Sequence, residues 1–488
     1  MGEHDGQVRV VSRRRFLGRS AAFLGSTAAF GILQACAGRA TPSSSAPIAS
    51  GGPGLSPGAS GEATNPLGVP AGEPLEVVIF KGGYGDDYAI NAEKIFNRVH
   101  PDTKITHLGI QRLREQLQPR FVGGNPPDVI DNSGGGNLDT AALVAEGQLA
   151  DLADLMDAPA LDTPGETFGD TLLAGSQSGG VFDGKQHVLK YASFVFGIWY
   201  SDSLFKSKGW QYPKTWDEML TLSDEIKKAG ISPWTYEGKN PYYFTQIFNQ
   251  MIWKHGGMQT YVNLDNLEPN AWKQPEVVNV AEALYQLADR GFFLPGTEGL
   301  TNTESQAEWL QGKAALLPVG SWIENEMKGL IPDGFDMVVQ PTPSLDASDK
   351  VPAQGIQSGA GEDFIVPAQG KNVQAGKEFL RVLFSRESAK FFAENTKSTT
   401  VVLNSTEGLK LGTAFDSVIT AVSTAGPNLL DPLAGYVVWY NKLVTEVNNQ
   451  MASLLTKRIQ PAEFLGNIQK VADQIAQDPS IKKYKRSA

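Results

Sequence analysis

Carboxylate side chains at short spacings are the residues of this chain that could support catalysis. Glu324 and Glu326 are two positions apart, and Asp151, Asp154 and Asp157 recur at every third position. Two carboxyl groups on opposite sides of a glycosidic bond can hydrolyse it, one as the acid and the other as base or nucleophile. Acids at these spacings more often form the solvated face of a helix, so we interpret both groups as surface residues.

Other reactive side chains do not occur in a catalytic pattern. The segment GSQSG places Gln177 where a hydrolase would have its nucleophilic serine. GKAA, beginning at Gly312, lacks the Ser or Thr of a phosphate loop, and GAGEDF has Phe364 in place of the third glycine of a dinucleotide site. The five histidines are scattered without the spacing of metal ligands: His4, His100, His107, His187 and His255. We therefore predict that the protein is not an enzyme and holds no metal or cofactor.

The single cysteine, Cys36, has a chemical role through its position near the start of the chain. It follows Arg13-Arg14-Arg15-Phe16-Leu17, which resembles a twin-arginine signal, and an uncharged apolar segment over residues 21–33. The residues LQAC, ending at Cys36, resemble a lipobox, at which cleavage leaves an N-terminal cysteine that carries lipid. We predict a signal peptide over 1–35 and a lipid anchor at Cys36, on the outer face of the cytoplasmic membrane. The alternative is a plain secretory signal followed by a chance cysteine.

The acidic composition excludes several kinds of partner. The net charge is −11, and the first 35 residues contain five arginines and two acids, so the processed chain is more acidic still. Such a chain is repelled by nucleic acid and by anionic lipid surfaces. Hydrophobic residues make up 41% of the 488 residues, enough to bury a large core in two or three domain-sized units.

Alternating strands and helices follow a linker. Residues 36–74 consist mainly of Gly, Pro, Ser, Ala and Thr, which is typical of a flexible linker. LEVVIF, TKITHLG and PPDVIDN are predicted strands; residues 88–99 and RLREQLQPRFVGG are predicted helices, the second interrupted at Pro119. This order predicts a parallel sheet whose ligand lies at the carboxyl ends of the strands.

A region of different character begins at the predicted strand FVFGIWYSDSLF, over residues 194–205, and contains most of the tryptophans. SGAGEDFIVPA predicts a return to strand, and residues 373–384 a helix. The C-terminal part, from about residue 404 to 484, is predicted to form helices interrupted at Pro427, Pro432 and Pro461.

Several stretches match one known family. The most informative is TESQAEWLQGKAALLPVGSWIENEMK, in which a predicted helix and strand lead to Gly320-Ser321-Trp322. PPDVIDNSGGG, GIWYSDSLF, YPKTWDEML and SGAGEDFIVPA match further parts of the same pattern. Together they resemble the family-1 extracellular solute-binding proteins, the carbohydrate-binding lipoproteins of ATP-driven importers. Within this family the chain is most similar to receptors for N-acetylglucosamine and N,N′-diacetylchitobiose.

The resemblance implies an α/β fold of the two-lobed, periplasmic-binding-protein-like type II class, with interleaved lobes and hinge crossings. The N-terminal lobe would comprise residues 75–196 and 351–396, and the C-terminal lobe residues 197–350 and 397–488. The solute would bind in the cleft between them. The order of elements, with a change of character at Phe194, is consistent with this division.

Aromatic side chains would bind the apolar face of a sugar ring. The resemblance implies stacking roles for Trp322, Tyr243 and Trp439. Further aromatic candidates are Trp234, Tyr236 and Tyr436. Each of these residues could instead belong to the core.

Polar groups would bind the hydroxyl and acetamido groups from the other lobe. Tyr84 and Asp86 follow the first predicted strand, Asp131 and Asn132 follow the third, and Asp363 follows Glu362 in a later one. Helix and turn capping is the alternative role, to which Asp86 is well suited.

The resemblance also implies partners. These are N-acetylglucosamine or diacetylchitobiose as ligand, a two-subunit permease with a cytoplasmic ATPase, and the membrane through the lipid anchor, for a monomeric receptor. The alternatives are a receptor of the same fold for another oligosaccharide or a non-sugar solute, and a surface glycan hydrolase.

Overall fold

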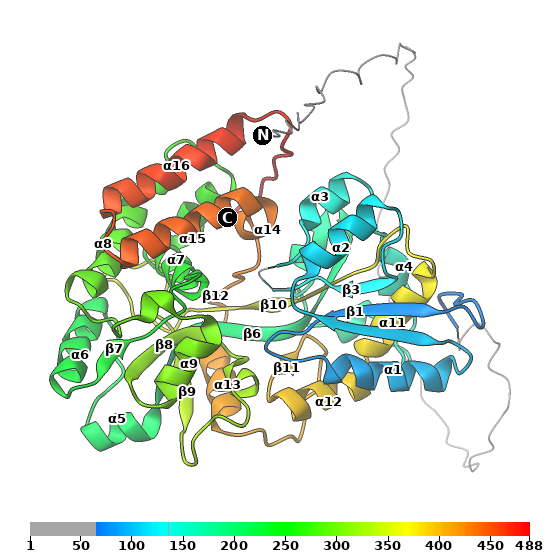
Figure 1. Ribbon diagram of the computed structural model, residues 1–488, viewed down its shortest axis with the longest axis horizontal. Helices are drawn as coiled ribbons and strands as arrows, with labels where there is room; N and C mark the ends of the chain where they lie inside the picture. Colours follow the sequence, from blue (N-terminus) through cyan, green and yellow to red (C-terminus); the bar gives the residue numbers. More distant parts are fainter. Residues whose placement is uncertain (1–64, 135) are drawn as a thin grey trace, which may run out of the picture. The chain divides into compact units, whose positions relative to one another are not determined.

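A mixed sheet with helices packed against it forms the body of the protein (Figure 1). The computed structural model describes residues 65–134 and 136–488. The predicted signal peptide, Cys36 and most of the predicted linker lie outside these residues. Within them, the strands of the main sheet follow the order β2-β1-β3-β10-β6-β8-β7, with β9 and β11 pairing with β6 and β12 with β10.

The first lobe packs around the parallel strands β1, β2 and β3. Its elements are β1 (Leu75–Phe80), α1 (Asp87–Val99), β2 (Ile105–Ile110), α2 (Leu113–Val122), β3 (Val129–Asp131), α3 (Thr140–Ala145), α4 (Ala153–Asp157), β4 (Val181–Phe182), β5 (Lys185–Gln186), α11 (Val373–Leu383) and α12 (Arg386–Thr396). Leu75, Val77 and Ile79 of β1 are fully buried, because helices cover the sheet. Parallel pairing brings the loops after β1 and β3 to the same edge.

The second lobe has its own core, which includes Trp216, Trp234 and Trp272. Its elements are α5 (Asp202–Lys208), α6 (Trp216–Lys228), β7 (Ser232–Trp234), α7 (Tyr242–Asp265), α8 (Pro275–Asp289), α9 (Asn302–Leu310), β8 (Ala314–Gly320), α10 (Ile323–Glu326), β9 (Met337–Gln340), α13 (Thr413–Ala425), α14 (Tyr436–Trp439), α15 (Asn441–Leu455) and α16 (Pro461–Gln477). Thr215 and Glu218 form a reciprocal capping box that starts α6.

Two long strands are shared between the lobes (Figure 1). Strand β6 (Val188–Ser201) pairs with β10 (Ile356–Ile365) in its first part, and with β8 and β9 in its second part. Two short strands add to this region: β11 (Thr399–Thr400) pairs with β6, and β12 (Leu429–Leu430) pairs with β10. The chain therefore passes between the lobes through hydrogen-bonded strands.

Two local predictions were wrong. The strand expected over residues 194–205 begins earlier and ends at Ser201, because the Ser201 hydroxyl accepts the backbone N–H of Leu204 and caps α5. Helix α2 is not interrupted at Pro119. Pro119 lacks an N–H donor, but Leu117 and Phe121 on either side of it are buried and hold the helix against the sheet.

Candidate functional site

Aromatic side chains gather around Trp322, two residues after the end of β8. Four rings surround the indole at centroid distances of 5.2–6.3 Å and interplanar angles of 50–86°: Tyr84, Phe194, Phe196 and Tyr243. None of the four stacks parallel to the indole, and Trp322 itself is half-buried. We call these five residues the Trp322 cluster. Its partly exposed indole offers a flat apolar surface.

Both lobes contribute to the Trp322 cluster. Tyr84 lies in the loop after β1, Phe194 and Phe196 lie on the shared strand β6, and Tyr243 lies in the first turn of α7. The indole Nε1–H of Trp322 donates to the hydroxyl of Tyr243 over 3.3 Å. The orientation of the indole is therefore set by side chains from separate parts of the sequence.

The loop after β1 lies directly against Trp322 and its helix. The side-chain amide of Asn325 donates to the carbonyl oxygen of Gly83 over 2.6 Å, which joins α10 to the first lobe. A Cβ atom on Gly83 would lie 3.0 Å from Cδ1 of Trp322. Glycine at this position therefore permits the close approach of backbone to indole.

Two carboxyl groups lie behind Tyr243. Glu237 is 4% exposed, and its Oε1 accepts the backbone N–H of Tyr243 over 2.5 Å. Its Oε2 is buried and has no hydrogen-bond partner in the part of the chain that the structure describes. Glu326 accepts the side-chain amide of Gln306 over 2.6 Å. Burial raises the pKa of Glu326, and it raises the pKa of Glu237 well above its ordinary value. A buried acid that keeps its proton can donate a hydrogen bond as well as accept one.

A second polar group surrounds Asp131 at the end of β3. Its carboxylate accepts the hydroxyl of Tyr88 over 2.8 Å and that of Ser133 over 2.5 Å, and it shares a hydrogen bond with Glu362 of β10. Burial raises the pKa of Asp131 to about 6, and burial followed by the charge of Asp131 raises that of Glu362 further. Glu362 also has a left-handed backbone conformation, with φ of 53°. Burial of the two neighbouring carboxyls therefore favours their protonated forms.

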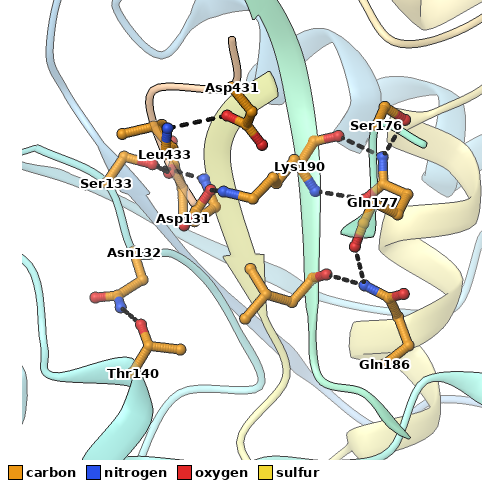
Figure 2. Close-up of polar contacts among 12 residues, drawn as sticks. Asp131, Asn132, Ser133, Thr140, Ser176, Gln177, Gln186, Lys190, Asp431 and Leu433 are labelled. Atoms are coloured by element: carbon orange, nitrogen blue, oxygen red, sulfur yellow. Dashed lines mark hydrogen bonds and ion pairs between the residues drawn. The ribbon is translucent and has the colours of Figure 1, made fainter. Parts of the chain in front are cut away.

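Lys190 of β6 reaches the same region from the shared strand (Figure 2). Its side chain is fully buried, and Nζ lies 3.0 Å from Oδ1 of Asp363. The backbone N–H and C=O of Lys190 are both bonded to the side-chain amide of Gln177, at 2.8 and 2.9 Å. The Lys190 charge also acts on Asp431, in the loop after β12, although burial raises the pKa of Asp431. The Lys190 ammonium group is therefore neutralised by nearby carboxylates of the protein.

The other predicted polar residues make contacts within the first lobe. Asp86 forms ion pairs with Lys81 at 3.0 Å and with His107 at 3.4 Å, and it does not cap α1 through its side chain. Asn132 is buried; its side chain bonds to the backbone of Leu138 and donates to the Thr140 hydroxyl. The hydroxyl of Tyr84 is buried and has no hydrogen-bond partner among residues 65–134 and 136–488.

Trp234 and Tyr236 lie in the core of the second lobe. Trp234 is fully buried and donates its indole N–H to Ser223 over 3.1 Å, while Tyr236 is 1% exposed and meets the ring of Phe244 edge-on. In this conformation both side chains are packed by their own lobe. Four further tryptophans are also buried: Trp210, Trp216, Trp272 and Trp309.

Tyr436 and Trp439 lie on α14, away from the rings that contact Trp322. Tyr436 is 1% exposed and donates to Asn249 over 2.9 Å. Trp439 is half-buried and packs against core residues of both lobes. One face of its indole is stacked on Tyr484, with the ring centroids 5.5 Å apart and the planes 26° apart. Trp439 is thus a second aromatic contact between the lobes.

The structure therefore brings Tyr84, Tyr243 and Trp322 together and leaves Trp234 and Tyr236 in a separate core. It also adds neighbours that were not proposed from the sequence: Phe194, Phe196, Glu237 and Asn325. An alternating pattern places Phe194 and Phe196 on one face of their strand, and this signal was available. Asn325 and Glu237 were not recognisable, because their roles depend on contacts between distant segments.

One group of side chains could supply metal ligands. His255, Asp346 and Asp349 can place three ligand atoms within 4.8 Å of one another. However, Nδ1 of His255 is bonded to Asp349 at 2.9 Å, and the carboxylate of Asp346 accepts the backbone and hydroxyl of Ser348. These bonds stabilise a turn, so the group is explained without an ion.

The family match and the most similar known proteins point to the same family. Residues 80–390 match the family described as bacterial extracellular solute-binding protein. The diacetylchitobiose binding protein NgcE of Streptomyces coelicolor is 35% identical over 429 residues, which cover 87% of this chain and 90% of that protein. The multiple sugar-binding protein of Streptococcus mutans is 23% identical over 295 residues, or 59% of this chain and 66% of that protein.

Solved structures have the same two-lobed fold. A chitin oligosaccharide binding protein superposes with a TM-score of 0.69 at 19% identity, covering 82% of this chain and 98% of that one. The GacH receptor of Streptomyces glaucescens GLA.O gives a TM-score of 0.66 at 18% identity, covering 83% and 99%. At these identities the likeness concerns the fold alone, and it confirms the fold class expected from the sequence.

The family match also indicates whether members catalyse a reaction and where they are located. Its members are solute-binding proteins rather than enzymes, and the family is extracellular. Among residues 65–134 and 136–488, no helix combines the length and apolar character needed to cross a bilayer. The fold, the match over residues 80–390 and the identity to NgcE agree. The chain belongs to the bacterial extracellular solute-binding protein family.

Proposed function

We propose that this protein captures N-acetylglucosamine or N,N′-diacetylchitobiose outside the cell and delivers it to a membrane importer. The observation that carries the proposal is the Trp322 cluster, a half-buried indole at the junction of the lobes with polar groups nearby. The name of NgcE, the relative at 35% identity, supports the choice of an N-acetylated sugar. The delivery partner is a two-subunit permease driven by a cytoplasmic ATPase, and the receptor acts as a monomer without enzymatic activity.

The chemistry of the cluster suits such a ligand. The C–H face of a pyranose ring would pack against the Trp322 indole, which is rigid and flat. Carboxyl and amide groups around it would bind hydroxyl and acetamido groups, with Glu237 and Glu326 available from the second lobe. The remaining predicted ligand residues, including Asp131, Asp363 and Trp439, belong to this proposal as contacts to be tested.

Both lobes must contact the solute for it to drive closure. A ligand shifts an equilibrium between open and closed forms only by its greater affinity for one of them. The bond from Asn325 to Gly83 already links the lobes beside Trp322. A sugar inserted there would add contacts to each side. We propose the lobe boundaries given above, residues 75–196 with 351–396 and 197–350 with 397–488, as the bodies that move.

Calorimetric titration tests the ligand directly. N-acetylglucosamine, diacetylchitobiose, longer chitin oligosaccharides, maltose and xylobiose would be compared on the purified protein. We expect saturable binding of the N-acetylated sugars, and at 100 times the dissociation constant a gain of about 2.7 kcal/mol in stability. Binding of another oligosaccharide alone would replace the proposed ligand. Hydrolytic activity on a bound sugar that persists after the protein is purified again would instead support an enzymatic function.

The anchor is a separate part of the proposal. We infer that the chain is exported by a twin-arginine signal and held on the outer face of the cytoplasmic membrane by lipid on Cys36. Replacing Arg13 and Arg14 by lysine should block export, and Cys36→Ser should release the protein into the medium. A Cys36→Ser protein that stays in the membrane after a carbonate wash would contradict the lipid anchor.

A further inference from the structure

The last residues of the chain leave α16, touch the first lobe at Lys482 and Tyr484, and return to the second lobe at Arg486. We call residues 480–488 the tail. Its anchor is Arg486, whose Nε donates to Oδ2 of the fully buried Asp265 over 2.7 Å. The same carboxylate accepts the backbone N–H of Tyr436 over 2.8 Å at the start of α14. A buried carboxylate needs such partners, so this end of the tail is firmly attached to the second lobe.

Tyr484 carries the tail to the junction of the lobes. Its backbone N–H donates to the hydroxyl of Tyr440 over 3.0 Å, and its ring stacks on Trp439 of α14. The same ring meets Phe182 of the first lobe nearly edge-on, at 6.0 Å and 80°. Phe182 belongs to the core cluster that contains Val78 of β1, so this contact reaches the first lobe itself.

A charged contact lies beside Tyr484. Nζ of Lys482 forms an ion pair with Asp183, in the turn between β4 and β5 of the first lobe. Asp183 and Gly184 both have positive φ, at 52° and 77°, which is typical of a tight hairpin turn. Lys482 and Asp183 are 43% and 61% exposed, so this pair contributes less than the aromatic contacts.

We propose that the tail is a strap that holds the two lobes together at Trp439 and so controls how fast solute is exchanged. The inference rests on the proposed function, because it concerns access to the same site. When the lobes separate, the contacts of Tyr484 and Lys482 with Phe182 and Asp183 must break. The contacts with Trp439, Tyr440 and Asp265 can remain, since all three residues belong to the second lobe. The strap therefore releases at its hairpin end.

A double variant tests the strap while keeping its anchor. Lys482→Ala with Tyr484→Ala removes both contacts to the first lobe and retains Arg486 on Asp265. The matched control is Lys485→Ala, because Lys485 pairs with Glu268 inside the second lobe at 2.6 Å. Scattering of the sugar-free proteins gives the radius of gyration, and stopped-flow fluorescence gives the dissociation rate of diacetylchitobiose.

We expect a larger sugar-free radius for the double variant and roughly three- to tenfold faster sugar dissociation, the range for losing an aromatic contact. The control should match the unmodified protein. A charge exchange adds a second check: Asp183→Lys should speed dissociation, and combining it with Lys482→Asp should restore the original rate.

Two results would overturn the strap, and a third would restrict it to its aromatic contacts. Unchanged radius and rate in the double variant would show that the tail does not hold the lobes. Tighter sugar binding in that variant would show instead that Tyr484 competes with solute for the face of Trp439. A failure of the charge exchange to restore the rate would remove the ion pair from the mechanism. If no sugar binds the unmodified protein, the proposed ligand fails, while the sugar-free radii still decide the strap.

Discussion

Trp322 and Trp439 both lie where the two lobes meet, but they are covered in different ways. The rings around Trp322 come from the loop after β1, from β6 and from α7, and none stacks on it. Trp439 has one face stacked on Tyr484, a residue near the end of the chain. Trp322 is therefore held by the body of the fold, whereas one face of Trp439 is covered by Tyr484 of the tail, which also contacts the first lobe.

The two indoles are therefore held in place in different ways. Around Trp322 the indole N–H, the close glycine and the neighbouring rings fix the geometry before a ligand arrives. Such preorganisation increases affinity because less freedom is lost on binding. Trp439 packs against core residues of both lobes and also against Tyr484, so only part of its packing comes from the tail.

The largest expected effect is that of Trp322→Ala. Loss of the central indole should weaken sugar binding by about thirtyfold or more, because truncating a buried aromatic anchor commonly costs 2 kcal/mol or more. Calorimetric titration below the unfolding temperature measures this change. Trp309→Phe is the matched control, since Trp309 is 1% exposed and packs in the same core cluster. Near-normal affinity in Trp322→Ala, with stability lowered by about 3–5 kcal/mol, would identify Trp322 as a core residue only.

A smaller effect is expected for Trp439→Ala. The variant loses the proposed solute contact and the surface on which Tyr484 stacks, so we expect about tenfold weaker binding, or about 1.4 kcal/mol. The dissociation rate should change more than the association rate. If Trp322→Ala and Trp439→Ala changed the association rate and the dissociation rate by equal factors, the proposed distinction between the two tryptophans would be wrong.

Gly83→Ala tests the packing around Trp322 without removing a ring. The added methyl group would lie 3.0 Å from Cδ1 and 3.2 Å from Cγ of the indole, so the loop or the indole must move. We expect about threefold weaker sugar binding and little change in unfolding temperature, since Gly83 is partly exposed. Gly85→Ala is not a suitable control, because Gly85 has a φ of 69° and a side chain at this φ would strain the backbone. Gly299→Ala, where the new Cβ meets open space, should leave affinity unchanged.

The smallest effect concerns the raised pKa values of Asp131 and Glu362. Both pKa values are raised in the folded protein, that of Asp131 to about 6, mainly by burial. Their contribution to the free energy of unfolding is full below about pH 4 and is lost as the pH rises through 6 and above. Glu362→Gln should therefore lose less stability between pH 5 and pH 8 than the unmodified protein. Urea unfolding at each pH measures this slope, and Glu308→Gln, which removes a surface pair with Lys313, should leave it unchanged.

Much of the fold followed from local patterns. The run LEVVIF became β1 over the expected residues, and Ala89, Ala92, Ile95 and Phe96 of α1 are buried as helical spacing predicts. The errors at Ser201 and Pro119 arose because a cap and a tertiary contact outweighed local preference. The family segments indicated Trp322 as a site residue, and this assignment stays a prediction.

The polar surroundings of the candidate site could not be predicted. Asn325 meets Gly83 across 242 positions of the sequence, and Asp363 meets Ser133 across 230, and no local pattern encodes such pairs. Trp234 shows the converse problem. Its sequence neighbourhood resembles that of a site aromatic, yet its indole N–H is satisfied by Ser223 in the core. Whether an aromatic residue is exposed at a lobe junction is decided by tertiary packing.

The placement of β10 has a consequence for synthesis of the protein. This strand lies between β3 and β6, and its Asp363 is bonded to Ser133, 230 positions earlier in the chain. The first lobe therefore lacks a central strand until residue 365 has left the ribosome. Contacts between such distant segments form slowly, because a long loop must close before they stabilise the fold. We expect nascent chains that end before residue 356 to remain protease-sensitive throughout, so that both lobes gain protection together late in translation.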